Sequence, residues 1–174
     1  DELLDVLQTL DTAWKEQPER IALIGQQVRN FLESRNKLSI NSIDLDESVF
    51  RIAHKKFLAM YDDRYFGFGT APKFPPTMKL SLLTRIALRT KDTTSKEIVM
   101  NTLKAMAKGG IYDHLGGGFH RYSTDRKWMI PPFEKMLYDQ AALSRAYLEG
   151  FQMTKDAFFE QVARGILDYV LRNM

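Results

Sequence analysis

The residues best suited to chemistry lie in one stretch of the chain, between positions 109 and 139. Five of the ten glycines and two of the three histidines fall within it. A loop that is held by rigid helices is a frequent place for binding and catalysis. The glycines would allow either a close approach of the backbone to a ligand or tight turns beneath packed aromatic side chains.

His120 is the candidate general acid or base of this stretch. Imidazole titrates near neutral pH, so it can take up and release a proton under physiological conditions. A histidine that holds the loop through hydrogen bonds to the backbone is an equal alternative. His114 follows Asp113 and is a candidate for ligand contact or for a structural role. His54, which stands before two lysines, is expected at the surface.

Three carboxylates accompany this histidine, and they complete the candidate catalytic set of His120, Asp113, Glu134 and Asp139. A glycosidase needs two carboxylates ~5 to ~9.5 Å apart. A sugar epimerase or isomerase needs a base beside an acidic C–H group, and histidine is suited to that task. The sequence does not fix distances in space, so both kinds of chemistry remain open.

Six further polar or aromatic side chains of the same stretch are candidates for contact with a substrate: His114, Arg121, Tyr122, Trp128, Lys135 and Tyr138. Tyr122 and Trp128 would stack on a sugar ring, and packing into a core is the alternative for either aromatic ring. Lys135 would contact substrate or pair with Asp139 four residues later on one helix.

Composition and motifs exclude several classes of protein. The chain has no cysteine, so it holds no disulfide, no cysteine-ligated zinc and no CxxC redox centre. It shows no P-loop, no GxGxxG motif after a strand and no HExxH motif, so we expect no cofactor and no metal. The net charge of +3 comes without a dense basic run, which argues against nucleic acid as a partner. No apolar run reaches ~20 residues and no signal peptide is visible. We therefore expect no membrane partner and a cytoplasmic location.

Apolar residues recur with helical spacing along most of the chain, and the pattern predicts seven helices. The first carries Leu3, Leu7 and Trp14 on one face, and the second begins at Pro18. The pattern lapses between residues 35 and 45, which is the predicted boundary between two parts of the chain. No strong sequence repeat is visible, although the paired helices would suit stacked helical hairpins.

The long loop after the fifth helix ends where two prolines begin the sixth. The spacing predicts that this helix starts at Pro131 and Pro132, which places Glu134 and Lys135 in its first turns. Within the loop, residues 119–130 predict a short β-hairpin with its turn near Asp125.

Several motifs together resemble the thioredoxin-domain-containing family of the spermatogenesis-associated, YyaL-like type. They are GGIYDHLGGGFHRYS at 109–123, Trp128, PFEKMLYDQA at 132–141, APKFP at 71–75 and Met106-Ala107. The resemblance extends from about Asp46 to the end of the chain. It implies that the chain is a fragment of a longer protein, which opens with a thioredoxin-like domain and continues as an α/α toroid. That toroid is similar to six-hairpin glycosidases and sugar 2-epimerases.

This chain departs from the family pattern at two places. The family has a histidine before Phe-Glu-Lys-Met-Leu-Tyr-Asp, and Pro132 stands there in this chain. If that histidine is catalytic in the family, this chain lacks the catalytic side chain. The family's Gly-Gly-Phe-Gly segment appears here as Phe66-Gly67-Phe68-Gly69, which is a milder change.

The sequence thus predicts an all-α chain, a partial α/α toroid of about seven helices with a short β-hairpin in its glycine-rich loop. Residues 1–45 are expected to connect a thioredoxin-like domain to the toroid, whose first helices are residues 46–174. The expected function is a pocket that binds or modifies a carbohydrate, in the manner of an epimerase, an isomerase or a glycosidase. The alternative is a non-catalytic scaffold for the thioredoxin-like domain of the same full-length chain. Whether the pocket catalyses a reaction is left open.

Overall fold

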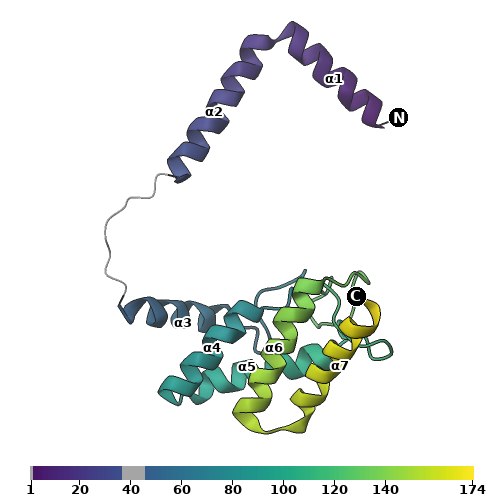
Figure 1. Ribbon diagram of the computed structural model, residues 1–174. Coiled ribbons are helices and arrows are strands. Elements are labelled where there is room, and N and C mark those ends of the chain that lie inside the picture. The colour runs from purple at the N-terminus through teal and green to yellow at the C-terminus, as the bar shows by residue number, and fades with distance from the viewer. Residues whose placement is uncertain (1, 37–45) are drawn as a thin grey trace. The chain divides into compact units, whose positions relative to one another are not determined.

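The computed structural model describes residues 2–36 and 46–174 (Figure 1). The described residues form seven α-helices, which confirms the all-α prediction: α1 (Glu2–Glu16), α2 (Pro18–Asn36), α3 (Ser48–Met60), α4 (Thr77–Thr90), α5 (Thr93–Lys108), α6 (Leu137–Thr154) and α7 (Ala157–Asn173). The helices fall into two units that divide after residue 45. None of the helices in the described ranges is both long enough and apolar enough to cross a bilayer.

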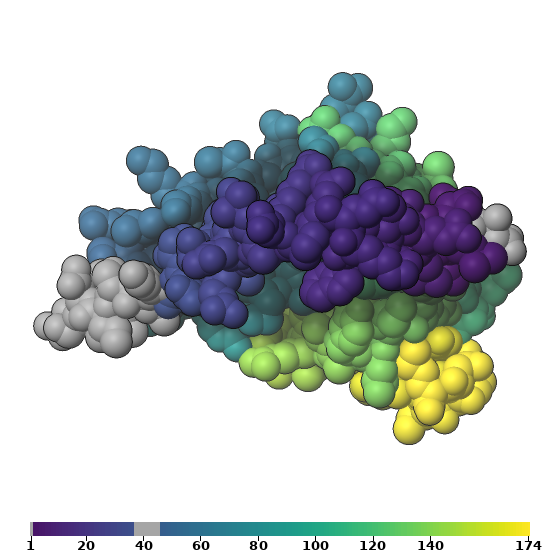
Figure 2. All heavy atoms as spheres, turned by 90° about the horizontal axis from the view of Figure 1, so that it is seen from above, coloured from purple at the N-terminus to yellow at the C-terminus, as the bar shows by residue number. Residues whose placement is uncertain are grey.

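Helices α1 and α2 form the first unit. Pro18 is the first residue of α2, where its missing N–H group costs nothing. The N–H group of Ile21 donates to the carbonyl of Gln17 across this junction, at 3.1 Å. Neither helix has a buried residue, and Figure 2 shows the atoms of these two helices in purple. Their apolar stripes therefore have no cover within this unit, with Leu3 71% and Trp14 67% exposed.

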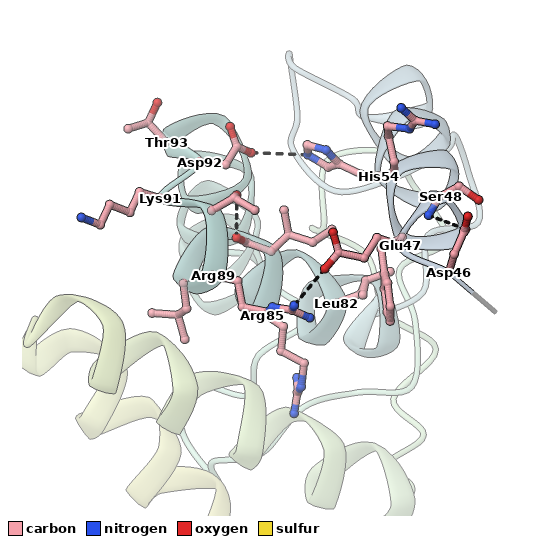
Figure 3. Close-up of a pocket in the computed structure, with 15 residues that line it drawn as sticks. Asp46, Glu47, Ser48, His54, Leu82, Arg85, Arg89, Lys91, Asp92 and Thr93 are labelled. Carbon is pink, nitrogen blue, oxygen red and sulfur yellow. Dashed lines mark hydrogen bonds and ion pairs between the residues drawn. The ribbon is translucent and has the colours of Figure 1, made fainter. Parts of the chain in front are cut away.

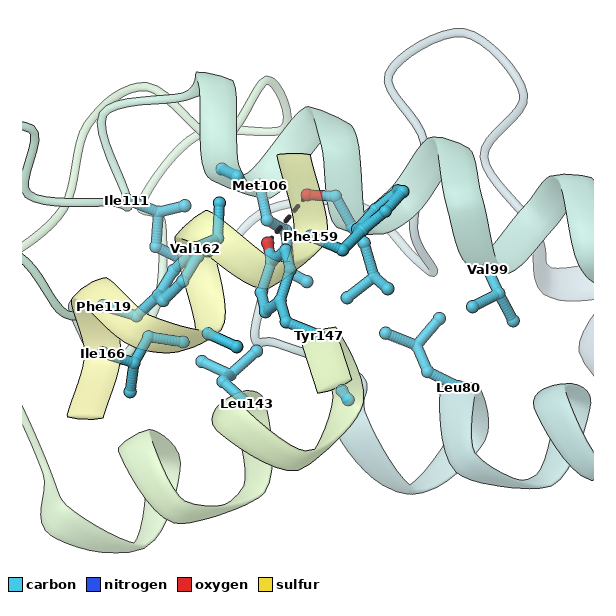
Figure 4. Packing of buried hydrophobic residues seen from close by; sticks show 14 of the residues in the cluster. Leu80, Val99, Met106, Ile111, Phe119, Leu143, Tyr147, Phe159, Val162 and Ile166 are labelled. Carbon is cyan, nitrogen blue, oxygen red and sulfur yellow. Dashed lines mark hydrogen bonds between the residues drawn. The ribbon is translucent and has the colours of Figure 1, made fainter. Parts of the chain in front are cut away.

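The second unit is built around α4, α5, α6 and α7. Helix α6 packs against α4, α5 and α7, and α4 also packs against α5. Leucine, isoleucine, methionine and aromatic side chains from these helices and from the loop after α5 fill the core (Figure 4). The hydroxyl of the fully buried Tyr147 donates to the carbonyl of Leu103 at 2.7 Å. Burial raises the pKa of Tyr147 well above its ordinary value, so this phenol is a fixed hydrogen-bond donor.

Helix α3 joins this core mainly through its last two turns. Phe57 packs edge-on against Phe68, with ring centroids 6.2 Å apart. His54 is half-buried, and its Nε2 lies 2.8 Å from the hydroxyl of Ser95 and 3.4 Å from a carboxylate oxygen of Asp92. The expectation of a surface histidine is therefore wrong, because His54 connects α3 to the residues that begin α5.

The predicted β-hairpin at 119–130 is not formed. Two of the isolated backbone bridges in the described residues involve this stretch, and none of them extends into a strand. A turn does lie at Asp125, whose carboxylate accepts from the N–H groups of Met129 and Ile130 at 3.1 and 2.6 Å. Because the Asp125 side chain takes up the N–H groups of Met129 and Ile130, these groups do not pair with a second strand. Trp128 has a φ of 69°, which also interrupts the extended backbone that a strand needs.

The predicted start of the sixth helix is also wrong. Helix α6 begins at Leu137, and the segment from Pro131 to Met136 is not helical. Phe133 has a φ of 63°, which a helix cannot accommodate. Glu134 and Lys135 therefore lie on an irregular segment before α6, and Lys135 does not sit one helical turn from Asp139.

Candidate functional site

The loop between α5 and α6 is organised by one carboxylate. The backbone N–H of Asp113 donates to the carbonyl of Gly118 at 3.0 Å. Its Oδ1 accepts from the N–H groups of Leu115 and Gly116, and its Oδ2 lies 2.8 Å from Nζ of Lys135. The N–H of Gly116 and the Lys135 ammonium hold the pKa of Asp113 well below its usual range. Both carboxylate oxygens of Asp113 are thus engaged inside the loop.

Lys135 closes the same turn from the other side. Its Nζ also donates to the carbonyl of Gly117 at 2.8 Å, and it lies 4.1 Å from the centroid of the Tyr169 ring on α7. The side chain is 12% exposed. Lys135 is therefore part of the turn, with its ammonium protons directed to groups of the protein.

The glycines of the loop make room for other parts of the protein. Gly118 has a φ of 77°, and a Cβ atom there would meet the Tyr169 ring at 2.6 Å. A Cβ on Gly109 would meet the carbonyl oxygen of Trp128. Of the two interpretations of the glycines, close packing of the loop on its own chain is the one that these contacts support.

His120 follows this turn and is 7% exposed. Its N–H donates to the carbonyl of Ile111 at 2.8 Å, and its ring meets the Phe133 ring edge-on, with centroids 5.4 Å apart. Burial and the nearby Lys135 ammonium lower the pKa of His120. Its Nδ1 is buried and has no hydrogen-bond partner among the described residues. The lowered pKa thus favours the neutral imidazole, and one ring nitrogen lacks a partner among the described residues.

Asp139 lies in the first turn of α6. Its Oδ2 is buried and lacks a hydrogen-bond partner within residues 2–36 and 46–174. Burial raises the pKa of Asp139, and the charge of Arg121 partly opposes this rise. A carboxyl in this state holds its proton more readily than one in water, which is a property of general acids.

Arg121 and Glu134 lie side by side at the surface. The N–H of Arg121 donates to the carbonyl of Glu134 at 2.8 Å, and the two side chains form an ion pair at 3.4 Å. Tyr138 is 61% exposed. Tyr122 stacks on Phe74, with ring centroids 4.8 Å apart and an angle of 27° between the planes. Arg121 is thus paired with Glu134, while Tyr122 packs on Phe74.

Two further candidates point into the protein. The Trp128 ring is fully buried, and its Nε1 donates to the carbonyls of Tyr65 and Phe66 at 3.1 and 3.2 Å. It offers no free face to a ligand. Nε2 of His114 lies 3.0 Å from the carbonyl oxygen of Gly109, so this ring holds the loop.

The structure therefore separates the candidate residues into two groups. Side chains that are exposed, or that keep a polar atom or a ring face unused by the loop, form the candidate site: His120, Arg121, Tyr122, Glu134, Tyr138 and Asp139. Side chains that build the loop beneath it are Asp113, His114, Trp128 and Lys135.

A large groove lies elsewhere, between α3, α4 and the start of α5 (Figure 3). Its volume is about 1390 Å³, and none of the candidate residues lines it. Several of its polar side chains bind one another. Arg89 and Glu47, for example, form an ion pair at 3.3 Å. The candidate site is by comparison an open surface. The volume of the groove would therefore point to one place on the protein, and the chemistry of the candidate side chains points to another.

Sequence reasoning missed a buried ionic cluster beside the candidate site. Nζ of Lys73 lies 2.7 Å from Oδ2 of Asp62, and these side chains are 0% and 2% exposed. Arg126 binds both oxygens of Asp62 through Nε and a terminal nitrogen, at 2.7 and 2.8 Å. Burial alone would raise the pKa of Asp62, but hydrogen bonds from Arg126 and Lys73 hold it well below its usual range.

The chain is similar to curated proteins of animals. It is 43% identical to Spermatogenesis-associated protein 20 of Rattus norvegicus and 42% identical to the human protein of that name, each over 97% of this chain and 22% of the relative. It is 37% identical to Uncharacterized protein B0495.5 of Caenorhabditis elegans, over 86% of this chain and 21% of that relative. No family model matches the chain. The chain thus spans about a fifth of the length of these relatives.

Proposed function

We propose that the chain is part of a longer protein of the spermatogenesis-associated, thioredoxin-domain-containing family, and that it contributes one side of a carbohydrate pocket. The similarity over 97% of the chain and 22% of the rat relative supports a larger protein. In this proposal, helices outside the chain close an α/α toroid with α3 to α7. The open surface around His120 would then become one wall of an enclosed pocket.

Two unpartnered polar atoms carry the proposal. A buried polar group without a hydrogen bond costs about 1–3 kcal/mol, and such groups are rare in folded proteins unless they serve a function. Nδ1 of His120 and Oδ2 of Asp139 are both of this kind among the described residues. In the proposal, hydroxyl groups of a ligand supply the partner that each of these atoms lacks.

Exposed rings around these atoms suit a sugar. Phe133, whose ring touches that of His120, is 79% exposed, and Tyr138 is 61% exposed. Aromatic faces beside a few convergent polar groups are typical of small-molecule sites. Arg121 and Glu134 would bind ring hydroxyls or a charged substituent at the edge of the surface.

The pKa values of His120 and Asp139 are shifted in opposite directions. The lowered pKa of His120 favours the neutral imidazole, which can accept a proton, and the raised pKa of Asp139 shifts that carboxyl toward its protonated form. Environments that push two pKa values in opposite directions identify an acid and a base. In the proposed reaction, His120 removes a proton beside a sugar carbonyl, or activates water, while Asp139 protonates an oxygen. Asp113 is assigned to the loop, because its oxygens are engaged.

A thermal-shift panel of mono- and disaccharides tests the proposal. We expect at least one sugar to raise the Tm of the chain, and we expect His120→Ala to remove that increase. His114→Ala is the matched control, because it alters a histidine of the same loop whose ring bonds to the backbone. That variant should have a lower Tm and keep the increase with sugar. An increase that survives in His120→Ala would refute the assignment of His120.

The apolar faces of α1 and α2 favour a second role, as a binding surface for a thioredoxin-like domain of the full-length protein. Leu7 and Trp14 lie on one face of α1 and are 54% and 67% exposed, and large exposed apolar patches mark interaction sites. A titration of the chain with that domain should show a complex that Leu7→Asp weakens. Thr12→Asp, on the opposite side of the helix, is the control. The absence of a complex with the unaltered chain would count against this role.

A further inference from the structure

One turn occurs twice in the chain, with a constant spacing between corresponding residues. The first copy runs from Met60 to Gly69 and the second from Ile111 to His120. Each has a Tyr-Asp pair at its start and a Gly-Phe pair before its last residue. In each, the tyrosine and the phenylalanine form an isolated antiparallel bridge.

Two backbone hydrogen bonds recur at corresponding positions of the two copies. The Asp62 N–H donates to the Gly67 carbonyl at 2.9 Å, as that of Asp113 donates to Gly118 at 3.0 Å. The last residue of each copy donates back to the first, at 3.3 Å in the first copy and 2.8 Å in the second. Each aspartate also accepts, through Oδ1, from the N–H groups two and three residues later.

A lysine from beyond each turn completes it. Lys73 lies 2.7 Å from Asp62, and Lys135 lies 2.8 Å from Asp113. Each ammonium also donates to the carbonyl of the residue before the Gly-Phe pair. We name each aspartate with its lysine a clamp. Because the clamp is present in both copies, it belongs to the construction of the turn and not to the chemistry of one loop.

The copies differ at the four positions between the aspartate and the glycine (63–66 and 114–117), and they differ again in the three residues that end and follow the turn. The first copy has Gly69, Thr70 and Ala71, which are small and exposed, where the second has His120, Arg121 and Tyr122. The first copy closes its last hydrogen bond with glycine, so an imidazole is not needed to close this turn.

The segments that follow the two copies pair with each other. The N–H and carbonyl of Ser123 exchange hydrogen bonds with those of Lys73, at 2.9 and 2.8 Å. Tyr122 consequently stacks on Phe74. Tyr122 thus lies beside a residue that follows the first copy.

We infer that both clamps are structural, and that ligand contact is made by residues 120–122, which end and follow the second copy and replace the small residues Gly69, Thr70 and Ala71 of the first. This inference rests on the proposed function for the ligand class, a hydroxyl-bearing sugar ring. In this inference, the imidazole of His120 and the guanidinium of Arg121 form hydrogen bonds with the sugar ring, and the phenol of Tyr122 contacts the edge of that ring. The inference also removes Asp113 and Lys135 from ligand contact and makes them positioning residues for His120.

The test gives the second copy the residues of the first. The double variant His120→Gly, Arg121→Thr keeps Tyr122 on Phe74, and we expect its Tm to stay within about 3 °C of the unaltered chain. Asp113→Asn leaves the Lys135 ammonium without its counter-charge, and we expect Tm to fall by at least about 6 °C. Asp62→Asn in the first copy should also give a loss of at least that size.

The probes are D-glucose, D-mannose and cellobiose, added to the same proteins. We expect the double variant to lose any increase in Tm that a probe gives the unaltered chain. A double variant that loses as much stability as Asp113→Asn would overturn the inference, and so would one that keeps the full response to a probe. If no probe binds the unaltered chain, the proposed function fails. The comparison of Tm values between the double variant and Asp113→Asn then decides by itself whether the side chains of residues 120 and 121 are needed for stability.

Discussion

Removal of the Asp62 carboxylate tests the energetic argument for the buried cluster. Asp62→Asn leaves the Lys73 ammonium, which is 0% exposed, without its counter-charge. Removing one partner of a buried ion pair costs about 3–5 kcal/mol. Arg126 adds little to that cost, since its side chain is 45% exposed and can turn to water. We expect a loss of about 3–5 kcal/mol, which lowers Tm by roughly 10–20 °C in a unit of this size.

Urea and thermal unfolding measure this loss. The indole of Trp128 donates to carbonyls of the first turn, so its fluorescence reports on the cluster. The other tryptophan, Trp14, is replaced by phenylalanine in all proteins compared.

A second substitution separates charge burial from packing. Asp62→Asn with Lys73→Met removes both buried charges, and an apolar replacement of a buried pair is often close to neutral. We expect the double variant to be more stable than Asp62→Asn alone. The reasoning is refuted if Asp62→Asn costs less than about 1 kcal/mol, or if the double variant is no more stable than the single one.

Three further predictions concern stability. The pKa of Asp113 is lower in the folded than in the unfolded state. The stabilisation that its carboxylate provides is therefore complete above the unfolded pKa of about 3.9 and is lost as the pH falls below that value. The fall of Tm at acid pH should accordingly be less steep in Asp113→Asn than in the unaltered chain. Gly118→Ala puts a Cβ 2.6 Å from a ring of α7 at a φ of 77° and should cost about 2–4 kcal/mol in urea unfolding, whereas Gly25→Ala, with open space in α2, should raise helicity by circular dichroism. Tyr147→Phe removes a buried hydrogen bond and should cost about 1 kcal/mol by thermal unfolding, while Tyr138→Phe, at an exposed ring, should cost nothing measurable.

The helices could be predicted from the sequence because burial acts through a simple period. The Pro18 start of α2 and the end of α5 before Gly109 follow from local backbone chemistry. The start of α6 could not be predicted in this way. Two prolines favour a helix start locally, but Lys135 is held by Asp113 and Gly117 from the preceding loop, and that contact keeps the segment out of a helix.

The candidate site could be located from the sequence, but roles within it could not be assigned. His120 and Trp128 are both ligand-type residues by chemistry, yet one keeps a free nitrogen and the other is buried against Tyr65 and Phe66. Which carboxylate is engaged depends on backbone N–H groups that no pattern of side chains reveals. The duplicated turn had a signal, a Tyr-Asp pair followed by Gly-Phe at 61–68 and again at 112–119, which the weak similarity between the other positions conceals.

The central claim is that the surface over His120 binds a sugar. The chain has three histidines, so the imidazole nitrogens can be followed individually by ¹⁵N NMR during a titration with the sugar panel. The account predicts a saturable shift of the His120 signals, above all Nδ1, and unchanged signals for His54 and His114. Signals of His120 that stay constant while a sugar binds, or that move no more than those of the other two histidines, would contradict it.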